Sequence, residues 1–297
     1  MDTTDTVGIV VTTWNGLEGT RATIESIRAT RSHQIIVSDN ASTDGTQQWA
    51  EEQGYPLVES GTNLGCGHAR NAGMGYAFAY GCDPVIVCQN DVLLHRDCID
   101  NLVEFQKRDG CAMACSARVT DLDLDDPSTA WFNSQRIEQY DRLINQSGPP
   151  ARIDTAAMLG KLDGVAPRDV TGGVSALVVA LMPRRTIQRV GWFDEGFTIA
   201  DWETRDYVRR IEWGSGRAAS TQLALHHHTG ANSWLYNKVD RDRTKDIEMK
   251  RCEDRYIAKW GGTFLSETHA PMEQASLWPG MTMVKWRKKR KRRGIRQ

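Results

Sequence analysis

Three apolar runs of this sequence end in polar side chains that could bind a polar ligand. The run "VGIVV" leads into Thr13 and Asn15, "QIIVS" leads into Asp39, and "PVIVC" leads into Gln89, Asn90 and Asp91. A strand that merely turns ends more often in Gly, Pro or Asn-Gly. Ligands of an open parallel sheet bind beyond the carboxyl ends of its strands. If these runs are parallel neighbours, their polar ends therefore line one crevice.

Asp39 is the clearest candidate for ligand binding among these residues. Its carboxylate could accept hydrogen bonds from the edge of a nucleic-acid base or from a ribose. The alternative is that Asp39 and Asp44 only build an Asx-turn within "DNASTDGT". The first run is not followed by G-x-G-x-x-G, which disfavours a dinucleotide-binding Rossmann site.

The elements that must position these residues follow from the alternation of strand-like and helix-like patterns. We expect strands at 7–14, 34–38, 56–60, 84–88, 111–116, 175–180 and 221–228. We expect helices at 16–30, 46–54, 66–81, 96–108, 183–190, 202–213 and 236–262. Two of the strands, at 84–88 and 175–180, are continuously apolar. This pattern is typical of a parallel sheet with helices on both faces, and it predicts an α/β fold.

Composition places the chain among soluble globular proteins. It has 297 residues, 40% of them apolar and 25% charged, which suits one large domain or two small ones. Seven cysteines without short paired spacings indicate neither a disulfide framework nor a zinc site, so a reducing cytosol is the expected compartment. The start, "MDTTDT", does not resemble a signal peptide, and the longest apolar run, at 176–182, is too short to span a bilayer.

A basic run at the C-terminus is hidden in the net charge of −1. Residues 285–297 hold nine Lys and Arg and no acid, and the rest of the chain has 28 basic against 38 acidic side chains. Self-repulsion predicts that 271–297 form a disordered tail, in which 285–297 could contact an anionic membrane or nucleic acid. A solvated tail without a partner is the alternative.

Residues 121–168 interrupt the alternation of strands and helices. Segments such as "DLDLDDPSTAW" and "NQSGPPARID" are loop-like, and we expect an irregular insertion within a domain that spans 1–270. A long excursion from a compact domain is usually functional or disordered. We therefore expect this insertion to cover the acceptor side of the site.

Eight segments in order carry a resemblance to a known family: "VGIVVTTWNG", "IIVSDNASTDGT", "NLGCGHARNAG", "VIVCQND", "VGWFDEGF", "DWETRDYVRR", "HHHTGANS" and "IAKWGG". They are similar to family 2 glycosyltransferases of the GT-A fold, most closely to the rhamnosyltransferase-like and galactofuranosyltransferase-like branches. The resemblance covers roughly residues 7–262 and is weakest over 121–168. It implies a mostly parallel, nucleotide-binding sheet with a C-terminal helical segment.

The resemblance also implies a divalent metal. In this family the fourth strand ends in an Asp-x-Asp-like motif that holds the ion against the diphosphate of a nucleotide sugar. Here only Asp91 supplies a carboxylate. The family's downstream His-x-Gly-x-x-Ser is matched by residues 228–233, which makes His228 the second expected ligand and His226, on the same strand face, the next candidate. Mn²⁺ or Mg²⁺ suits such ligands and would neutralise the leaving diphosphate.

An inverting transfer also needs a carboxylate that takes the proton of the acceptor hydroxyl. The family places it in an acidic pair at the start of the helix after "FDE-x-F". Alignment on Asp206 and Arg210 puts that pair on Glu203 and Thr204. Thr204 is no base, so the resemblance leaves Glu203, Asp201 or a chain that has lost the role. Alternatively, the two acids only cap and stabilise the helix N-terminus.

Further positions match the donor-binding residues of the family. The nucleoside, with uracil or thymine as base, would be held by Thr13, Asn15 and Asp39. Asn63 and Arg70 would lie near the ribose and diphosphate, Asn90 would bind the nucleotide sugar, and Gly172 and Gly173 would let the backbone approach the donor or the acceptor. For Arg70 a salt bridge from its helix is the alternative, and for the two glycines tight packing. Trp192 and Trp202 could stack on a sugar, although core packing is more common for tryptophan.

The prediction is therefore a cytoplasmic, metal-assisted, inverting glycosyltransferase, with the tail as a contact to the inner face of the membrane. Its donor would be a UDP- or dTDP-sugar and its acceptor a glycan, a lipid-linked glycan, a protein or modified DNA. One alternative is a catalytically inactive protein that binds a nucleotide sugar or a polyanion. The other is a sugar-phosphate nucleotidyltransferase, which would need a Gly-rich loop bearing Arg or Lys where this chain has "TTWNGLEGT".

Overall fold

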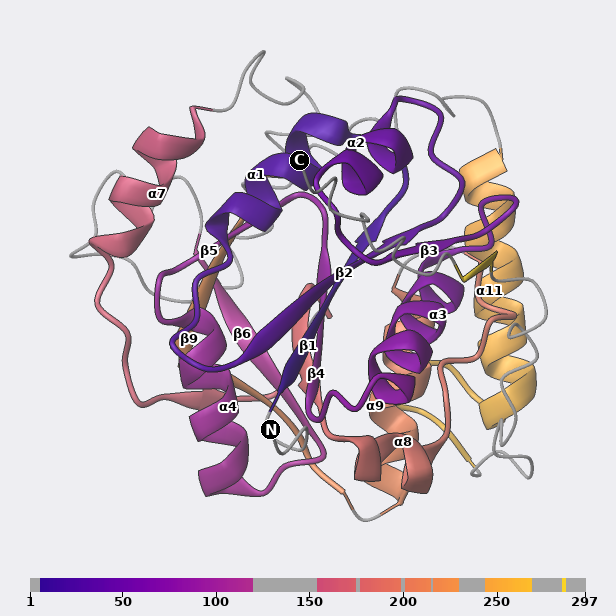
Figure 1. The fold of residues 1–297 in the computed structure, drawn as a ribbon. Coiled ribbons are helices and arrows are strands. Elements are labelled where there is room, and N and C mark those ends of the chain that lie inside the picture. The colour runs from indigo at the N-terminus through magenta and orange to yellow at the C-terminus, as the bar shows by residue number, and fades with distance from the viewer. Residues whose placement is uncertain are drawn as a thin grey trace, which may run out of the picture.

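The computed structural model describes residues 6–119, 154–174, 177–198, 201–214, 216–229, 244–268 and 285–286. They form a central sheet with helices on both faces (Figure 1). The strands are β1 (Val7–Thr13), β2 (His33–Asp39), β3 (Leu57–Glu59), β4 (Val85–Gln89), β5 (Val92–Leu94), β6 (Met113–Val119), β7 (Thr171–Gly172), β8 (Val179–Met182), β9 (Ala218–His228) and β10 (Lys285–Trp286). The helices are α1 (Leu17–Ser26), α2 (Thr46–Glu52), α3 (Cys66–Ala79), α4 (Cys98–Asp109), α7 (Thr155–Asp163), α8 (Arg184–Val190), α9 (Trp202–Trp213) and α11 (Thr244–Trp260).

The strand order is β10-β3-β2-β1-β4-β8-β6-β9-β5, and β7 pairs with β9. The pairs β1–β2, β1–β4, β2–β3 and β6–β9 are parallel. The predicted mostly parallel sheet with helices on both faces is thus confirmed. The direction of the strand predicted near 175–180 was wrong. This strand is β8, which lies antiparallel to both β4 and β6 instead of parallel to its neighbours. Burial on two faces makes a strand apolar in either direction.

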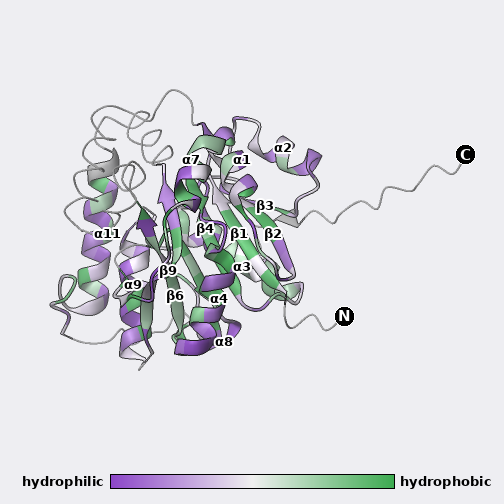
Figure 2. Ribbon diagram, turned by 90° about the vertical axis from the view of Figure 1, so that its left-hand side faces the viewer, coloured by the Kyte–Doolittle hydropathy of each residue, from purple (hydrophilic) through white to green (hydrophobic). Residues whose placement is uncertain are grey.

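Two apolar clusters flank the sheet, and alternate residues of β1 supply both. Ile9 and Val11 belong to the cluster with α1, α2 and α4, whereas Val10 belongs to the cluster with α3, α8 and α9. Figure 2 shows the strands as the most hydrophobic part of the fold, with polar residues on the outer helices. The period-two alternation of a strand therefore fixes which helix layer each β1 side chain meets.

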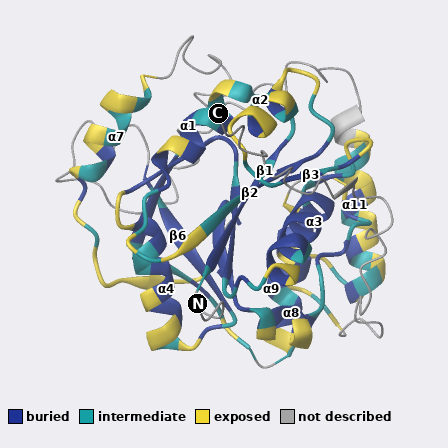
Figure 3. Cartoon of the chain, in the orientation of Figure 1, coloured by how far each residue is buried: buried dark blue, intermediate teal, exposed yellow. Residues whose placement is uncertain are grey.

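Helix α3 packs closely against the sheet, and most of its residues are buried (Figure 3). Its Gly and Ala residues allow this approach. An added Cβ at Gly73 would come within 2.2 Å of Val10 Cγ1 and 3.1 Å of Ser38 Cβ. The Ala/Gly-rich composition of this helix thus fixes its distance from β1 and β2, and with it the position of the α3 N-terminus at the strand ends.

Replacing Gly73 with Ala is expected to destabilise the fold by about 1–3 kcal/mol, because the methyl group overpacks the contact with β1. Urea unfolding would measure the change. Gly160→Ala in α7 is the matched control, since no atom lies within 4 Å of its added Cβ. There the better helix propensity of Ala should add up to about 1 kcal/mol. Equal effects of the two substitutions would contradict this account of the α3 packing.

The helical C-terminal segment packs on the outside of α9. Phe197, Trp202, Cys252, Tyr256 and Trp260 form a small apolar cluster between them. The predicted helix over 236–262 is observed as α11 from Thr244 to Trp260, and its expected first part, 236–243, lies outside the described residues. It ends at Gly261, whose φ of 71° lies in the left-handed region favoured by glycine.

The insertion predicted to be irregular contains a helix, α7. Its N-cap is Asp154, whose carboxylate accepts a hydrogen bond from Ala157 N at 3.0 Å. Leu162 is buried beside β5, and Asp163 pairs with Arg28 at 2.7 Å. Asp154 followed by helix-forming residues was a readable start signal. Residues 120–153, the larger part of the insertion, lie outside the described residues.

Of the predicted tail, only β10 is described, and it extends the sheet antiparallel to β3. These two residues are therefore a strand, which the prediction of disorder did not include. The remaining residues of 269–297 lie outside the described part of the chain. Across the described residues, the structure contains no helix with the length and hydrophobicity needed to cross a membrane.

Candidate active site at the carboxyl ends of the strands

The ends of β1, β2 and β4 lie side by side. Thr13 is the register partner of Asp39, and Thr12 is the partner of Gln89. Asn40 N donates a hydrogen bond to Thr13 O at 2.8 Å. The polar residues that follow the three strands therefore meet at one edge of the sheet.

Asn90 holds these strand ends together. Its buried amide nitrogen lies 2.9 Å from Thr13 Oγ1, 2.8 Å from Asn15 O and 3.0 Å from Thr20 Oγ1. Helix α1 approaches closely as well, since a Cβ on Gly19 would lie 2.7 Å from Asn90 O. The two amide hydrogens of Asn90 are thus used within the protein. Its role toward a nucleotide sugar stays a prediction, and its visible role is to position the next residue, Asp91.

Asp39 has one engaged and one open carboxylate oxygen. Its Oδ1 accepts hydrogen bonds from Ser42 N at 2.9 Å and from Gln47 Nε2 at 2.6 Å. Its Oδ2 is buried and has no hydrogen-bond partner among the described residues. The Asx-turn and a ligand contact are therefore compatible, because each uses a different oxygen. A buried acceptor without a partner is costly unless a ligand supplies the donor.

Asn15 lies beside this carboxylate and fixes the loop after β2. Its backbone is left-handed, with φ 57°. Its side-chain Oδ1 accepts from Thr43 N at 2.8 Å, and its own N–H donates to Ser42 Oγ at 2.7 Å. The loop that carries Asp39 is therefore anchored to the end of β1.

Asp91 and His228 are in direct contact where β5 and β9 pair antiparallel. Asp91 Oδ2 lies 3.2 Å from His228 Nε2, and the Asp91 side chain is 2% exposed. The strand register brings them together, because Val92 is the partner of His228. Thr229 donates from both its N–H and its hydroxyl to Asp91 O at 2.9 Å. Residues predicted from two distant motifs thus form one cluster.

The other two histidines of the row point to protein partners. His226 Nδ1 lies 2.7 Å from Ser116 Oγ, and His227 Nδ1 lies 3.0 Å from Val119 O. Burial, helped by the neighbouring His228, lowers the pKa of His226 well below its usual range, so its ring is neutral. The predicted alternation along β9 is observed. The structure brings His228, and not His226, into contact with Asp91 within the described residues.

The Asp91–His228 pair fits a divalent ion whose remaining ligands come from substrate. Both ring nitrogens of His228, including the Nε2 that faces Asp91, are buried without a hydrogen-bond partner in the described part of the chain. Two ligand atoms at right angles, each about 2.1 Å from an octahedral ion, lie about 3 Å apart, as these two do. No cluster of three or more His, Cys, Asp or Glu that could hold a metal occurs among the described residues. Such a two-residue set suits an ion bound chiefly by phosphates and water.

Arg70 and Glu203 form a buried ion pair between α3 and α9. Arg70 Nη1 donates to Glu203 Oε1 at 2.6 Å, and its Nη2 donates to Leu177 O at 3.1 Å. The two side chains are 2% and 1% exposed. Burial raises the pKa of Glu203, and the charge of Arg70 opposes that rise. The salt-bridge alternative for Arg70 is what the structure contains, and this bridge encloses one of the two candidate bases.

Asp201 is the exposed acid of the pair of candidate bases. It precedes α9 with a φ of 86°, a strained conformation for a residue with a side chain. Strain of this kind gathers at functional sites. Its carboxylate is close enough to raise the pKa values of Glu203 and of the Cys66 thiol. Asp201 occupies the N-cap position of α9, as the alternative expected, but its side chain makes no capping hydrogen bond.

Cys66, at the start of α3, connects the two halves of the site, and sequence reasoning missed it. Burial raises the pKa of its thiol to about 11, an effect that Arg70 opposes and that Glu203, Asp201 and Asp91 increase. The thiol is therefore within electrostatic range of both the metal-ligand candidate and the base candidates. Its position after "NLG", the segment that approaches the ligand side, was the available signal.

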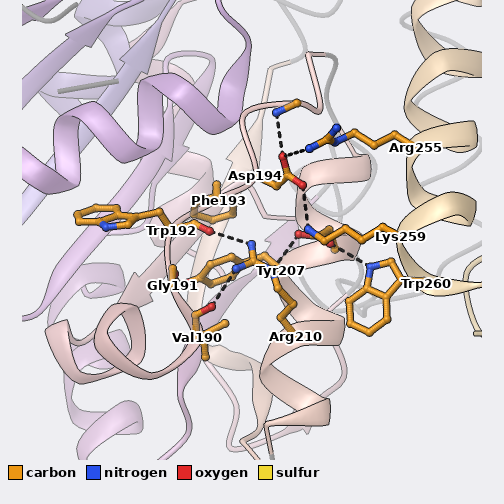
Figure 4. Close-up of polar contacts among 12 residues, drawn as sticks. Val190, Gly191, Trp192, Phe193, Asp194, Tyr207, Arg210, Arg255, Lys259 and Trp260 are labelled. Atoms are coloured by element: carbon orange, nitrogen blue, oxygen red, sulfur yellow. Dashed lines mark hydrogen bonds and ion pairs between the residues drawn. The ribbon is translucent and has the colours of Figure 1, made fainter. Parts of the chain in front are cut away.

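A network of ion pairs fixes the loop before α9 to α11 (Figure 4). Asp194 accepts from Arg255 at 2.7 Å and from Lys259 at 2.8 Å. Lys259 also contacts Asp206 Oδ1 at 2.8 Å, and the indole of Trp260 donates to the same oxygen at 2.9 Å. The "WFDEGF" segment is thus tied to the C-terminal helix.

Arg210 completes this network on the inner side of α9. It donates from Nε to Asp206 Oδ2 at 2.9 Å and to the carbonyl oxygens of Val190 and Trp192 at 2.9 Å each. Asp206 and Arg210, on which the family alignment was anchored, therefore have a structural role. They fix α9 to the segment that follows α8.

The Asp194 network predicts a loss of stability in acid. Burial would raise the pKa of Asp194, but Lys259 and Arg255 lower it from 3.8 to about 2. A carboxyl with a lowered folded-state pKa stabilises the fold above its unfolded pKa, and this contribution disappears as the pH falls toward 2. The full contribution is about 2 kcal/mol, and about half is lost by pH 3.

Urea unfolding at pH 6 and pH 3 would measure this effect. The stability difference between the two pH values should be about 1 kcal/mol smaller in Asp194→Asn than in the wild-type protein. Asp169→Asn, which removes an exposed partner of Arg108, is the control and should keep the wild-type difference. An unchanged difference in Asp194→Asn would contradict the assignment.

The remaining predicted residues are less closely associated with the crevice. Asn63 is exposed, and its Oδ1 accepts from Asn40 Nδ2 at 2.6 Å and from Gly65 N at 3.0 Å. Gly172 and Gly173 are also exposed, and Gly172 pairs with Ser220, near the opposite end of β9 from His228. The structure does not bring these two glycines to the Asp91 cluster, and their ligand roles stay predictions.

The two tryptophans also pack within the protein. Trp202 packs against Tyr256 in the apolar cluster of α9 and α11, with the ring centroids 5.3 Å apart and the ring planes tilted by 50°. Trp192 packs against the core on the α3 side, with its ring centroid 6.3 Å from that of Phe78. Core packing, the more common role of tryptophan, is therefore what the structure contains at both positions.

Comparison with known proteins agrees with this geometry. The model of the glycosyl transferase family 2 matches residues 8–159, more than half of the chain and a range that holds β1, β2, β4, Asp39 and Asp91. The chain belongs to glycosyl transferase family 2. Family membership confirms the resemblance and disfavours the nucleotidyltransferase alternative. The rhamnosyltransferase-like or galactofuranosyltransferase-like branch stays a prediction. A comparison with curated proteins gives no match.

Solved structures share the fold of this family 2 chain. The mannosyltransferase PcManGT from Pyrobaculum calidifontis, in complex with GDP-Man and Mn²⁺, is 18% identical, with a TM-score of 0.51 over 89% of this chain and 65% of its own. GalNAc-T7, with UDP, GalNAc and Mn²⁺, is 14% identical, with a TM-score of 0.52 over 75% of this chain and 43% of its own. The chain thus spans less than two thirds of either structure.

Proposed function

We propose that this chain is a metal-assisted, inverting glycosyltransferase that moves a sugar from a UDP- or dTDP-sugar to a hydroxyl group. The observation that carries the proposal is the contact of Asp91 with His228 at the sheet edge that also holds Asp39. A nucleoside site and a cation site on neighbouring strand ends are what a nucleotide-sugar donor requires. The family and the folds of the two solved structures support this assignment.

The open oxygen of Asp39 favours uracil or thymine as the donor base. Each of these bases presents one imide N–H on its pairing edge, and Oδ2 of Asp39 is a single buried acceptor. Guanine presents two adjacent donors, which suit a carboxylate with both oxygens open. The other oxygen of Asp39 is already bound to Ser42 and Gln47.

The leaving diphosphate would be held by a divalent ion on Asp91 and His228. When bound, Mn²⁺ or Mg²⁺ supplies positive charge to the departing phosphate oxygens. Asn90, the residue before Asp91, is fixed by its hydrogen bond to Thr13 at the end of β1. Thr229, after β9, donates to the backbone oxygen of Asp91. Asp91 is therefore held in place from two sides. The arrangement needs no second carboxylate, because phosphate and water complete the coordination.

Asp201 is the better candidate for the base. It is exposed at the start of α9, whereas Glu203 is enclosed and paired with Arg70. As the acceptor oxygen forms its bond to the anomeric carbon, Asp201 would take its proton, and the bond from that carbon to the diphosphate oxygen would break. The Glu203–Arg70 pair would position α9 for this step.

The acceptor and the cellular location extend the proposal. A glycan or a lipid-linked glycan is the proposed acceptor, with protein and modified DNA as further classes. The basic residues 285–297 would contact an anionic membrane surface from the cytoplasmic side, or else nucleic acid. Salt would weaken either contact strongly, because both depend on charge.

A second candidate is a binding protein without transferase activity. Thr204 at the usual place of the acid and the enclosure of Glu203 favour it. It shares the nucleotide site with the first candidate and differs only in the proton-accepting group. The two functions are therefore separated by turnover, not by binding.

A panel of nucleotide sugars tests the proposal through slow donor hydrolysis, which needs no known acceptor. We expect release of UDP or dTDP that requires Mn²⁺ and stops after chelation. Nucleotide binding without release across the panel would support the binding protein, and no binding would contradict both.

The Asp39→Asn variant places an amide against the imide N–H and should weaken UDP binding roughly tenfold to a hundredfold. Asp44→Asn, in the same loop, is the control. Asp44 contacts Leu17 N and Thr46 within the protein, so this variant should bind UDP as the wild type does.

A further inference from the structure

A cavity lies at the edge of the sheet opposite the candidate active site. Its volume is about 370 Å³. Residues at the end of α4 and on α8 line it, together with Cys111, just before β6, and Gly216, just before β9. Because β6 and β9 run parallel to each other and to β4, these starts mark the amino edge of the sheet. The cavity is therefore separate from the crevice of Asp39 and Asp91.

Cationic side chains dominate its lining. Arg185, Arg189 and Arg217 line the cavity, with Asp109 as its one acidic residue. Asp109 forms an ion pair with Arg217. Neither Arg185 nor Arg189 has a carboxylate partner among the described residues. The cavity thus has a surplus of positive charge that the described protein groups do not neutralise.

The two unneutralised arginines share one face of a short helix. Arg185 and Arg189 are four residues apart on α8, so their charges repel each other across one turn. Arg189 is held in place because its Nη2 donates to Gly214 O. Arg217 is held by Asp109 in the same way. Two of the three guanidinium groups are therefore already oriented before any ligand binds.

We propose that this cavity binds a phosphate monoester. Guanidinium groups donate paired hydrogen bonds that match the oxygens of a phosphate, and the doubly charged group would relieve the repulsion between Arg185 and Arg189. A phosphate alone fills only part of the volume, which is in the range of small-molecule sites. Val190 and Ile211 supply an apolar wall for the body of the ligand. The phosphate belongs either to a soluble metabolite or to a lipid headgroup.

Isothermal titration of the full-length protein with inorganic phosphate and with glycerol 3-phosphate tests the proposal. EDTA is present throughout, so that the metal-dependent donor site does not bind the probes. We expect saturable binding that Arg185→Gln weakens at least about tenfold, the effect of losing one charge-assisted hydrogen bond. Arg185 is exposed and makes no hydrogen bond or ion pair within the described part of the chain, so this variant should fold. The double variant R185Q/R189Q should lose binding.

Arg251→Gln on α11 is the matched control, because it removes an exposed arginine, 68% accessible, away from the cavity.

Sedimentation with phosphatidic acid vesicles and with phosphatidylcholine vesicles is the second experiment. Phosphatidic acid capture that is lost in R185Q/R189Q but kept in Arg251→Gln would place the phosphate on a lipid. Wild-type protein that binds no probe in either experiment, or variants that bind as the wild type does, would overturn the proposal.

Discussion

Replacing Asp91 with Asn is expected to lower the rate of donor turnover at least about a hundredfold, because a metal at the leaving group contributes several kcal/mol of transition-state stabilisation. The amide keeps the shape of the side chain but removes its charge. The contact with His228 Nε2 at 3.2 Å identifies the site that would be lost. Turnover of the preferred UDP- or dTDP-sugar, followed over a range of Mn²⁺ concentrations, measures the effect.

Two comparisons make this result specific. Asp97→Asn changes an acid close by in the sequence whose side chain is 54% exposed and contacts Arg96, and it should leave turnover unchanged. High Mn²⁺ should restore part of the activity of Asp91→Asn, because an amide oxygen is a weaker ligand than a carboxylate. Wild-type turnover and wild-type Mn²⁺ dependence in Asp91→Asn would contradict the proposal that a catalytic cation binds at Asp91.

The second large effect is expected from the candidate base. Asp201→Asn should lower kcat by about 10²–10⁴, the usual contribution of general base catalysis, while the KM for the donor changes little. Asp201 is exposed and makes no capping hydrogen bond, so the fold should tolerate the change. Single-turnover kinetics with donor and an active acceptor extract would measure the chemical step.

Glu203→Gln distinguishes the two carboxylates. This variant leaves Arg70 without its charged partner in a buried position, which typically costs about 3–5 kcal/mol of stability. We expect a lower midpoint of urea unfolding with kcat reduced far less than in Asp201→Asn. If Glu203→Gln stops the chemical step and Asp201→Asn does not, the assignment of the base is reversed.

Much of the fold was predictable because its signals are local. Turn residues after β2, the Ala/Gly composition of α3 and the apolar period of α9 each indicate one element. Strand direction was not predictable for β8, since an apolar run buried on both faces looks the same in either direction. Strand β5 was missed, because three residues after Asp91 give no period to recognise.

The positions of the candidate site residues were predictable as far as strand ends determine them, and their roles stay predictions. The rule that parallel strands end at one edge brings Thr13, Asp39 and Asp91 together, and the family resemblance singled out His228, which the structure places beside Asp91. The Arg70–Glu203 pair joins residues 133 positions apart. It depends on how α3 and α9 pack, which no local pattern encodes. For the same reason, the choice between Asp201 and Glu203 needed their observed burial.

The bridge made by Lys259 between Asp194 and Asp206 has a consequence for engineering. A segment exchange intended to alter which acceptor is used would naturally cut between "WFDEGF" and the final helix, treating them as separate cassettes. In such a chimera the carboxylates of Asp194 and Asp206 would lose their ion pairs with Lys259, because the lysine would come from a different parent protein. The workable unit of exchange therefore begins before Asp194 and runs through Trp260 without interruption.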